Sequence, residues 1–442
     1  MNRSNHRSPH RTPQRSSNRQ PNRSVLAFRR YMLFFLAATA AILAYFWLAY
    51  REPVPAWAEG TAADPRSFLS VADAERASSY SMLRDSLYFV GTLWEWGMLL
   101  WLLTSGYART LSQRLKAAVP SVVVRFPLYI AGISAALFAL GLPLRLLSYS
   151  IARNYDVSTL SFGGWWRDQW VQLGVDTVLL LAVGAVVFAL ARKGGTWWFR
   201  LWLLSIPFLL FMMVIRPLAI DPLFYKYEPL ADPALEHAVL EMTSKAGVPT
   251  DRVYEANYSE KTNAINAYVD GFGPSLRIVI WDTALQKLTA DEIVVLTAHE
   301  VAHYVKHHLQ WSAVGGVASM FLLLWIGNKA YRAILKRWRA FLFVRHPADW
   351  AGLPLMLLVV SVLSFAATPI SSAVSRHAEL EADRFAYALT GDADAAVTLY
   401  QKLASSSRAA VHPPALTYWF RYTHPSLGSR IAEALRYERE LP

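Results

Sequence analysis

The chain contains no cysteine among its 442 residues, and only 17% of those residues are charged. The absence of cysteine excludes disulfides, thiolate zinc ligands and cysteine nucleophiles. The scarcity of charge argues against an ordinary soluble protein, in which roughly a quarter of the residues are charged. Hydrophobic residues instead make up 54% of the chain, and 17 tryptophans suit a protein with long membrane–water boundaries. The composition therefore points to a membrane protein.

The net charge of +12 comes mainly from the first 30 residues. They hold eight arginines and no acidic residue, so the rest of the chain carries +4 (12 − 8). This excess is weak evidence for nucleic-acid binding, and no nucleic-acid partner is expected. Residues 1–24 contain too few apolar side chains to offset their chain entropy, which predicts a disordered basic tail.

Seven apolar runs are long enough to cross a bilayer as helices. Residues 31–50 contain no charge, and at 1.5 Å per residue they span about 30 Å. Ala56-Trp57-Ala58 resembles a signal-peptide cleavage site, but the apolar run before it is too long for a signal peptide, which favours an uncleaved anchor. The six other runs cover residues 87–107, 127–147, 171–191, 197–219, 312–334 and 351–370.

The charges of the connecting loops predict an orientation. Three loops contain arginine or lysine and no acid, namely residues 107–126, 192–200 and 332–345. With seven spans they lie on the same side as the basic tail, whereas the opposite loop, 51–86, contains six acids. The positive-inside rule then places the N-terminus in the cytoplasm and the C-terminus outside. The polar segments 220–311 and 371–442 both fall on the outer side.

A metal-binding pattern lies in the first polar segment. Residues 291–310 are helical in pattern and contain the sequence HEVAH at 299–303. Residues four apart share a helix face, so His299 and His303 can bind one zinc ion while Glu300 reaches a water molecule beside it. Apolar neighbours indicate a buried helix, in which unpaired polar side chains would be costly. A solvated helix with two surface histidines is the disfavoured alternative, and one zinc ion per chain is expected.

Catalytic zinc normally has three protein ligands, so one more is needed. The metzincin pattern is excluded because Lys306 and Leu309 stand where that pattern requires glycine and histidine. His307 and His308 lie one turn beyond the motif, and we interpret them as structural or supporting groups. The third ligand must therefore come from elsewhere in the chain.

The second polar segment offers candidates for that ligand. Residues 371–390 show a second helical pattern, in which Glu379 and Asp383 lie on one face. This spacing suits a carboxylate ligand followed by a carboxylate that accepts a hydrogen bond from a ligand imidazole. His377 is an alternative ligand, and Glu381 points away from this face. An ordinary charged amphipathic helix is the other interpretation.

The order of motifs along the chain adds a further signal. A long membrane region precedes Asn266-Ala267-Tyr268, then RIVIWDT at 277–283, HExxH, two spans and SRHAELEAD at 375–383. Pro222-Leu223-Phe224 and His424-Pro425-Ser426 with Arg430 complete the set. Over roughly residues 85–440, this combination resembles the integral-membrane CAAX prenyl endopeptidases (type 1) and their bacterial relatives.

The resemblance assigns roles to the metal-site candidates. It implies that His299, His303 and Glu379 ligate zinc, that Glu300 is the general base, and that Asp383 orients a ligand histidine.

The resemblance also implies two contacts with a peptide substrate. Asn266, Ala267 and Tyr268 would form an edge strand against which the substrate backbone lies extended, a mode that tolerates many side chains. His424 would stabilise the oxyanion from the side opposite Glu300. A turn histidine before proline is the alternative interpretation of His424.

The expected fold is an all-α polytopic membrane protein with about seven transmembrane helices, and the resemblance implies that they surround a chamber. A gluzincin-like HExxH metallopeptidase domain with a small β-element completes it. Glu95 interrupts the second apolar run and fits a chamber lining, because a carboxylate at that depth normally faces a bundle interior. The expected divisions are a tail (1–24), five spans (25–219), a first metallopeptidase segment (220–311), spans six and seven (312–370) and a second metallopeptidase segment (371–442).

The expected function is a membrane-embedded zinc endopeptidase that acts on membrane-associated or lipidated proteins, with the lipid bilayer and a peptide substrate as partners. The alternatives are a quality-control protease of broad specificity and, from another class, a transporter or receptor with a structural zinc site. The expected location is the bacterial inner (plasma) membrane. Eukaryotic relatives imply a cytosolic catalytic side, whereas the loop charges, which we follow here, place it outside. The natural substrate, its prenylation, the oligomeric state and the role of the tail, including any binding to acidic lipid, stay open.

Overall fold

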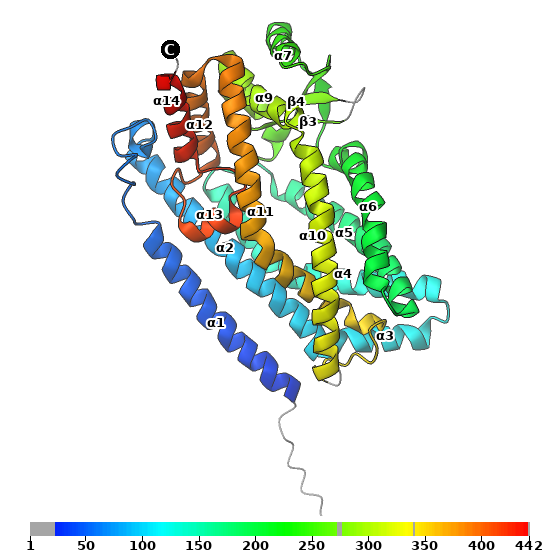
Figure 1. Ribbon diagram of the computed structural model, residues 1–442. Helices are drawn as coiled ribbons and strands as arrows, with labels where there is room; N and C mark the ends of the chain where they lie inside the picture. Colours follow the sequence, from blue (N-terminus) through cyan, green and yellow to red (C-terminus); the bar gives the residue numbers. More distant parts are fainter. Residues whose placement is uncertain (1–22, 272–275, 339–340, 441–442) are drawn as a thin grey trace, which may run out of the picture.

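The structure is a computed structural model that describes residues 23–271, 276–338 and 341–440 (Figure 1). Residues 1–22 of the expected basic tail lie outside this range, and Arg23 begins the first helix. Long helices form the body of the molecule, and the smaller polar elements gather at one end of it.

Six helices of the described chain are long and apolar enough to cross a membrane. They are α1 (Arg23–Ala49), α2 (Val71–Thr104), α4 (Val122–Asn154), α5 (Phe162–Lys193), α10 (His308–Trp338) and α11 (Leu353–Thr390). A seventh span is obtained if α6 (Trp197–Ile215) and the segment after it, which bends by 45°, are taken together. The seven runs expected from the sequence thus correspond to these helices.

The helices extend well beyond the apolar runs. The basic segment expected as a loop after α2 contains a further helix, α3 (Tyr107–Ala118). The expected seventh span, 351–370, and the expected ligand helix, 371–390, are one continuous helix, α11. Its backbone hydrogen bonds continue past Pro369 into the polar segment, because a change of side-chain polarity does not end a helix.

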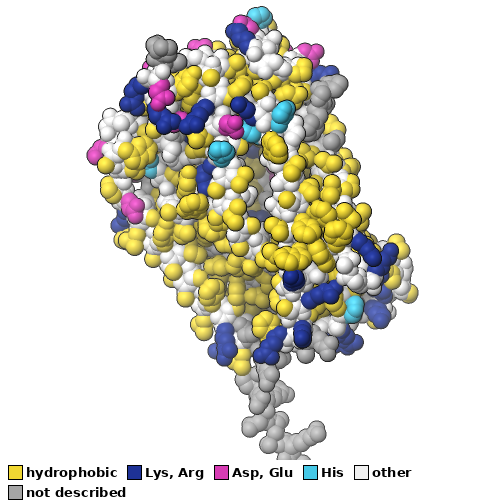
Figure 2. Space-filling model, in the orientation of Figure 1, with side chains coloured by type: hydrophobic (Ala, Val, Ile, Leu, Met, Phe, Trp, Pro, Cys, Tyr) yellow, Lys and Arg dark blue, Asp and Glu magenta, His cyan; other side chains and the backbone are white. Residues whose placement is uncertain are grey.

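The surface of the helical body is apolar. Leu33 and Leu36 on α1, Val178 on α5 and Leu322 on α10 are all more than half exposed. Figure 2 shows hydrophobic side chains across the middle of the visible face, with lysine and arginine at both ends and the visible acidic side chains in the upper half. An exposed apolar band of this extent suits contact with lipid chains, which impose no cost on exposed leucine.

A four-stranded sheet forms the β-element. Its strands are β1 (Tyr227–Pro229), β2 (Val253–Ala256), β3 (Ala267–Asp270) and β4 (Arg277–Trp281). Their order is β1-β2-β4-β3, with β2 and β4 parallel and the other pairs antiparallel. Ile278, Val279 and Ile280 of β4 are fully buried, as a strand covered on both faces requires. β3 is an edge strand, so one side of its backbone has no strand partner within the described sheet.

Six further helices complete the polar end of the molecule. They are α7 (Pro233–Lys245), α8 (Asp282–Lys287), α9 (Ala290–Val305), α12 (Ala393–Ser407), α13 (Ala415–Arg421) and α14 (Leu427–Glu440). One apolar core joins Val239, Ile278 and Val301 from the first polar segment with Ala386 and Ile431 from the second. The two polar segments therefore fold as one unit, although two membrane-length helices separate them in the chain.

A cavity of about 910 Å³ lies between the membrane helices. Its lining comes from α2, α4, α5 and α11, with Arg421 of α13 at its border. Glu95 is part of this lining, as expected for a residue that faces a lumen, and Arg145 and Asp176 line the same cavity.

Candidate active site

The helix α9 carries the HExxH motif and is held firmly at its N-terminus. Thr289 and Glu292 form a capping box, in which each side chain accepts a hydrogen bond from the backbone of the other residue. Glu292 also pairs with Lys402 of α12 at 2.7 Å. Ala298, Val301 and Ala302 are completely buried, so one side of α9 is fixed in the core.

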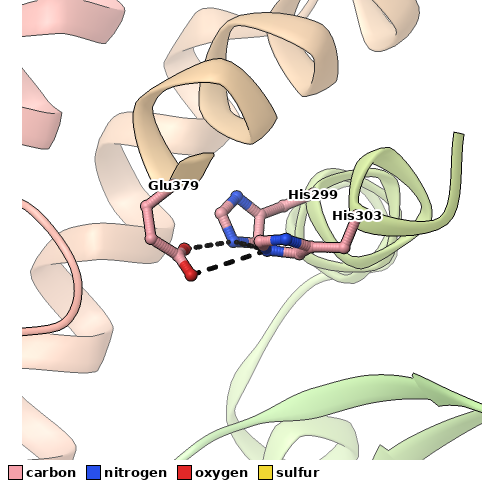
Figure 3. Close-up of side chains that lie close together, drawn as sticks. All are labelled: His299, His303 and Glu379. Atoms are coloured by element: carbon pink, nitrogen blue, oxygen red, sulfur yellow. Dashed lines mark hydrogen bonds and ion pairs between the residues drawn. The ribbon is translucent and has the colours of Figure 1, made fainter. Parts of the chain in front are cut away.

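His299, His303 and Glu379 point toward one another, with both histidines on α9 and the glutamate on α11 (Figure 3). His299 Nε2 lies 3.0 Å from Glu379 Oε2 and 3.3 Å from His303 Nε2. His303 Nε2 lies 3.7 Å from Glu379 Oε1. With bonds of about 2.0–2.1 Å, nitrogen and oxygen ligands of a tetrahedral zinc ion lie roughly 3.3 Å apart. The observed distances bracket that value, so these three residues fit a zinc ion.

Behind His299, Asp383 holds the imidazole in place. Asp383 is fully buried, and its Oδ1 lies 2.8 Å from His299 Nδ1. The same carboxylate accepts hydrogen bonds from Arg430, through Nε at 2.9 Å and Nη2 at 2.6 Å, and from the Tyr400 hydroxyl at 3.1 Å. With its Nδ1–H donated to Asp383, His299 directs its Nε2 lone pair at the position shared with Glu379.

The electrostatics of the site favour a cation. Burial lowers the pKa of His299, but its hydrogen bonds to Asp383 and Glu379 outweigh that effect and raise the pKa to about 9. The two carboxylates therefore stabilise a positive charge at this imidazole. A metal ion bound at Nε2 would supply the positive charge that the two carboxylates stabilise, in place of a proton.

His303 has a different supporting partner. Its Nδ1 lies 3.0 Å from Nδ1 of His308, whose Nε2 is 3.4 Å from Glu381 Oε2 on α11. The left-handed backbone of His307, with a φ of 58°, separates α9 from α10. After this turn the side chain of His308 lies against His303, whereas His307 is exposed.

Glu300 lines a cleft of about 340 Å³ that also contains His299, His424 and Asn266. Burial raises the pKa of the Glu300 carboxyl, which makes it a stronger base than an exposed glutamate. A carboxylate placed beside the metal position and open to a cleft is suited to accept a proton from a water molecule there.

His424 lies at the rim of the same cleft. Its Nε2 is 3.1 Å from Glu379 Oε2, and half of its side chain is exposed. The imidazole is therefore close to the metal position and accessible to a substrate. His377, the alternative third ligand, is exposed and is not part of the His299–His303–Glu379 cluster.

The residues expected to hold a substrate backbone lie at the sheet edge. Asn266 lines the cleft and directly precedes β3, the edge strand that contains Ala267 and Tyr268. The Asn266 carbonyl accepts a hydrogen bond from the Trp281 amide, which ties this segment to β4. An extended peptide could add to the free side of β3 beside the cleft.

The sequence analysis did not predict the contacts that three residues make with Asp383 or His303. Arg430 appeared only as a member of a motif, and His308 had no defined partner. Tyr400 carried no signal at all, because a tyrosine within an amphipathic helix is typical of an ordinary core position.

Comparison with known proteins identifies the family. The profile of peptidase family M48 matches residues 229–438, and the profile described as CAAX prenyl protease N-terminal, five membrane helices, matches residues 58–226. The uncharacterized metalloprotease YhfN of Bacillus subtilis (strain 168) is 37% identical over 395 residues, covering 89% of this chain and 93% of YhfN. The chain belongs to peptidase family M48. This M48 protein is therefore a metalloendopeptidase, a class that acts on peptide bonds with a bound metal.

More distant relatives of this M48 peptidase match it over about half of their length. CAAX prenyl protease 1 homolog of Arabidopsis thaliana is 30% identical over 250 residues, 56% of this chain and 58% of the plant protein. CAAX prenyl protease 1 of Saccharomyces cerevisiae is 28% identical over 244 residues, 52% of this chain and 53% of the yeast protein. These matches confirm the resemblance to the CAAX endopeptidases that the motif order indicated.

The fold of the M48 peptidase is also shared with a solved structure. The crystal structure of S. mikatae Ste24p superposes with a TM-score of 0.77 at 20% sequence identity, covering 92% of this chain and 98% of Ste24p. Together with the membrane-helix profile, this match confirms the predicted all-α polytopic membrane protein with a small sheet. The protein is a multi-pass integral membrane protein.

Proposed function

We propose that this M48 peptidase uses one zinc ion, held by His299, His303 and Glu379, to hydrolyse peptide bonds of membrane-associated or lipidated proteins. The observation that carries the proposal is the near-tetrahedral spacing of three ligand atoms beside Glu300, in a cleft that opens to solvent. A structural zinc site normally has four protein ligands and no free position. Three ligands and an adjacent acid are the pattern of a catalytic site.

The residues around the site have separate roles in the hydrolysis. A bound zinc ion supplies Lewis acidity, which polarises the scissile carbonyl and makes a water molecule more acidic. Glu300 accepts the proton of the attacking water and passes it to the leaving amine. His424 donates a hydrogen bond to the developing oxyanion from the rim of the cleft. Asp383 keeps His299 in the tautomer that ligates the metal.

The substrate enters as an extended chain. The free side of β3, from Ala267 onward, offers backbone hydrogen bonds that any peptide sequence can make. The cavity between the membrane helices provides an apolar-sided space for a lipid anchor or a membrane segment, because Leu99, Leu180 and Val360 are among its lining residues. These two features support a substrate that is both extended and membrane-attached.

The positions of the basic residues support the proposed orientation. The active site is at the end of the molecule that carries α9 and α14, and the lysines and arginines of α3, α10 and the end of α5 belong to the opposite end (Figures 1 and 2). The positive-inside rule therefore supports a cytoplasmic N-terminus and an extracytoplasmic catalytic side in a bacterial inner membrane.

The experiment uses the full-length protein, purified in detergent, and an internally quenched peptide in lipidated and unlipidated forms. Chelation should abolish cleavage and zinc should restore it. Glu300→Gln should retain zinc and lose at least about 10²-fold in kcat, whereas His303→Ala should lose both metal and activity. Full turnover by Glu300→Gln would refute the mechanism. Equal cleavage of the two peptide forms would favour a quality-control protease of broad specificity.

A further inference from the structure

Two arginines lie against one tryptophan at the basic end of the molecule, opposite the active site. Arg125 is in the first turns of α4, and Arg192 is in the last turn of α5. Their guanidinium carbons lie 5.4 Å and 6.0 Å from the centre of the Trp350 ring, within the range of a cation–π contact. Two separate membrane helices thus place a guanidinium group beside the same side chain.

The tryptophan that the two arginines share is a fixed support. Trp350 begins the short helix η6 (Trp350–Gly352) and is 8% exposed. Its ring centre lies 4.9 Å from that of Phe126, and its carbonyl accepts a hydrogen bond from the Tyr129 hydroxyl at 2.7 Å. All three aromatic residues belong to one buried apolar core. The ring therefore holds the two guanidinium groups near each other without neutralising their charge.

Neither guanidinium group has an anionic partner among the residues that the structure describes. Three segments supply the charges of this end, with 12 arginines and lysines and one acid in total, namely residues 107–126, 192–200 and 332–350. The one acid is Asp349, whose carboxylate accepts hydrogen bonds from the backbone amides of Arg345 and Ala351. A single carboxylate cannot balance twelve cations, so this end keeps a large positive excess.

Both arginines lie at the level of the lipid headgroups. The apolar run of α4 begins at residue 127 and that of α5 ends at residue 191, so each arginine lies directly outside an apolar run. The anionic group of a bilayer at this depth is the lipid phosphate, whose oxygens accept the paired N–H donors of arginine. Val123 and Leu128, on either side of Arg125 in α4, are 82% and 45% exposed. These side chains offer contact to acyl chains, which a free phosphate ion lacks.

We propose that Arg125 and Arg192 bind the phosphate of one anionic phospholipid, whose acyl chains lie along the exposed apolar side chains of α4. A zwitterionic lipid also carries a positive group, which the surrounding cations repel. The positive excess at this end therefore selects a lipid with a net negative charge. The bound lipid joins the beginning of α4 to the end of α5 and anchors this end of the molecule in its leaflet.

The test measures lipid binding to the full-length protein by native mass spectrometry, with phosphatidylglycerol and phosphatidylcholine of identical acyl chains in equal amounts. The wild type should retain one phosphatidylglycerol with a Kd at least about 10-fold lower than that of phosphatidylcholine, the low end for a hydrogen bond to a charged group. Arg125→Gln and Arg192→Gln should each raise the Kd of phosphatidylglycerol by about 10-fold and leave the binding of phosphatidylcholine unchanged.

Matched variants separate a local site from the charge of the whole end. Lys116→Gln removes one positive charge from α3, at the same end of the molecule, and should keep the lipid preference. Arg192→Lys keeps the charge without the paired donors and should give an intermediate Kd. The side chain of Arg192 is exposed, so Arg192→Gln should have the wild-type unfolding temperature in uncharged detergent. This control shows that a lost preference is not a loss of folding.

The possible outcomes support or overturn the proposal without any measurement of proteolysis. Loss of the preference in both glutamine variants, with Lys116→Gln unaffected, supports the site. Equal Kd values of the two lipids for the wild type would refute it. An equal loss in Lys116→Gln would assign the attraction to the whole basic end and overturn the site. If inorganic phosphate raises the unfolding temperature of the wild type as much as phosphatidylglycerol does, the pair binds free phosphate, and the proposal is also overturned.

Discussion

The buried carboxylate of Asp383 lies 2.8 Å from Nδ1 of His299 and joins three helices at that point. Asp383 belongs to α11, His299 to α9, and Arg430, which donates two hydrogen bonds to the same carboxylate, to α14. The proposed metal ligand is thus positioned by elements from both polar segments of the chain.

Asp383→Asn should weaken zinc binding by about 10-fold, the lower end of the range for such supporting groups. The amide can still accept the hydrogen bond from His299, but the negative charge that favours a cation is lost. Titration against a competing chelator measures the effect, and activity should return at high zinc. Asp251→Asn, at an aspartate whose side chain is 95% exposed, is the matched control and should bind zinc like the wild type.

The contact between His303 and His308 leads to a second prediction. His308→Ala leaves the Nδ1 of His303 without its partner at 3.0 Å, so the ring can rotate away from the metal position. We expect zinc affinity to fall by about 10-fold, as measured by the same competition titration. His307→Asn is the control, because asparagine tolerates the positive φ of this exposed residue. Equal losses in both variants would contradict a specific role for His308.

The position of His424 predicts a selective loss of turnover. If its imidazole stabilises the oxyanion, His424→Ala should lower kcat by about 10²-fold and leave KM and bound zinc nearly unchanged. Steady-state kinetics and metal analysis on the same preparation separate these quantities. An unchanged kcat would favour the alternative that His424 is only a turn residue before Pro425.

The absence of cysteine allows a direct test of orientation. Asp251→Cys places a thiol at the catalytic end, and Lys116→Cys places one on α3 at the basic end. With the proposed orientation, a membrane-impermeant maleimide added to intact spheroplasts should label Asp251→Cys and leave Lys116→Cys unlabelled until the membrane is opened. The reverse pattern would place the catalytic side in the cytoplasm.

The features that the sequence predicted are those that depend on local periodicity. His299 and His303, and likewise Glu379 and Asp383, are four residues apart on single helices, so each pair shares a face whatever the rest of the fold does. The membrane helices follow in the same way from uninterrupted apolar runs. The resemblance to a family then joined the two pairs, which the spacing within each helix could not do.

Other features depend on contacts that no local pattern contains. Asp85 meets Thr417 and Arg421 across 332 and 336 residues of chain, so its partners could not be read from its neighbours. The placement of His308 depends on one left-handed residue, His307, for which the sequence offers no glycine or asparagine signal. The continuity of α11 was also hidden, because hydropathy records where lipid contact ends and not where the helix ends.

The continuity of α11 fixes the distance between the apolar run and the proposed metal ligand Glu379. Glu379 lies nine positions after Ile370, the end of the apolar run, which is about 14 Å along the axis of a continuous helix. The continuous helix therefore fixes how far the proposed ligand Glu379 lies from the last apolar turn.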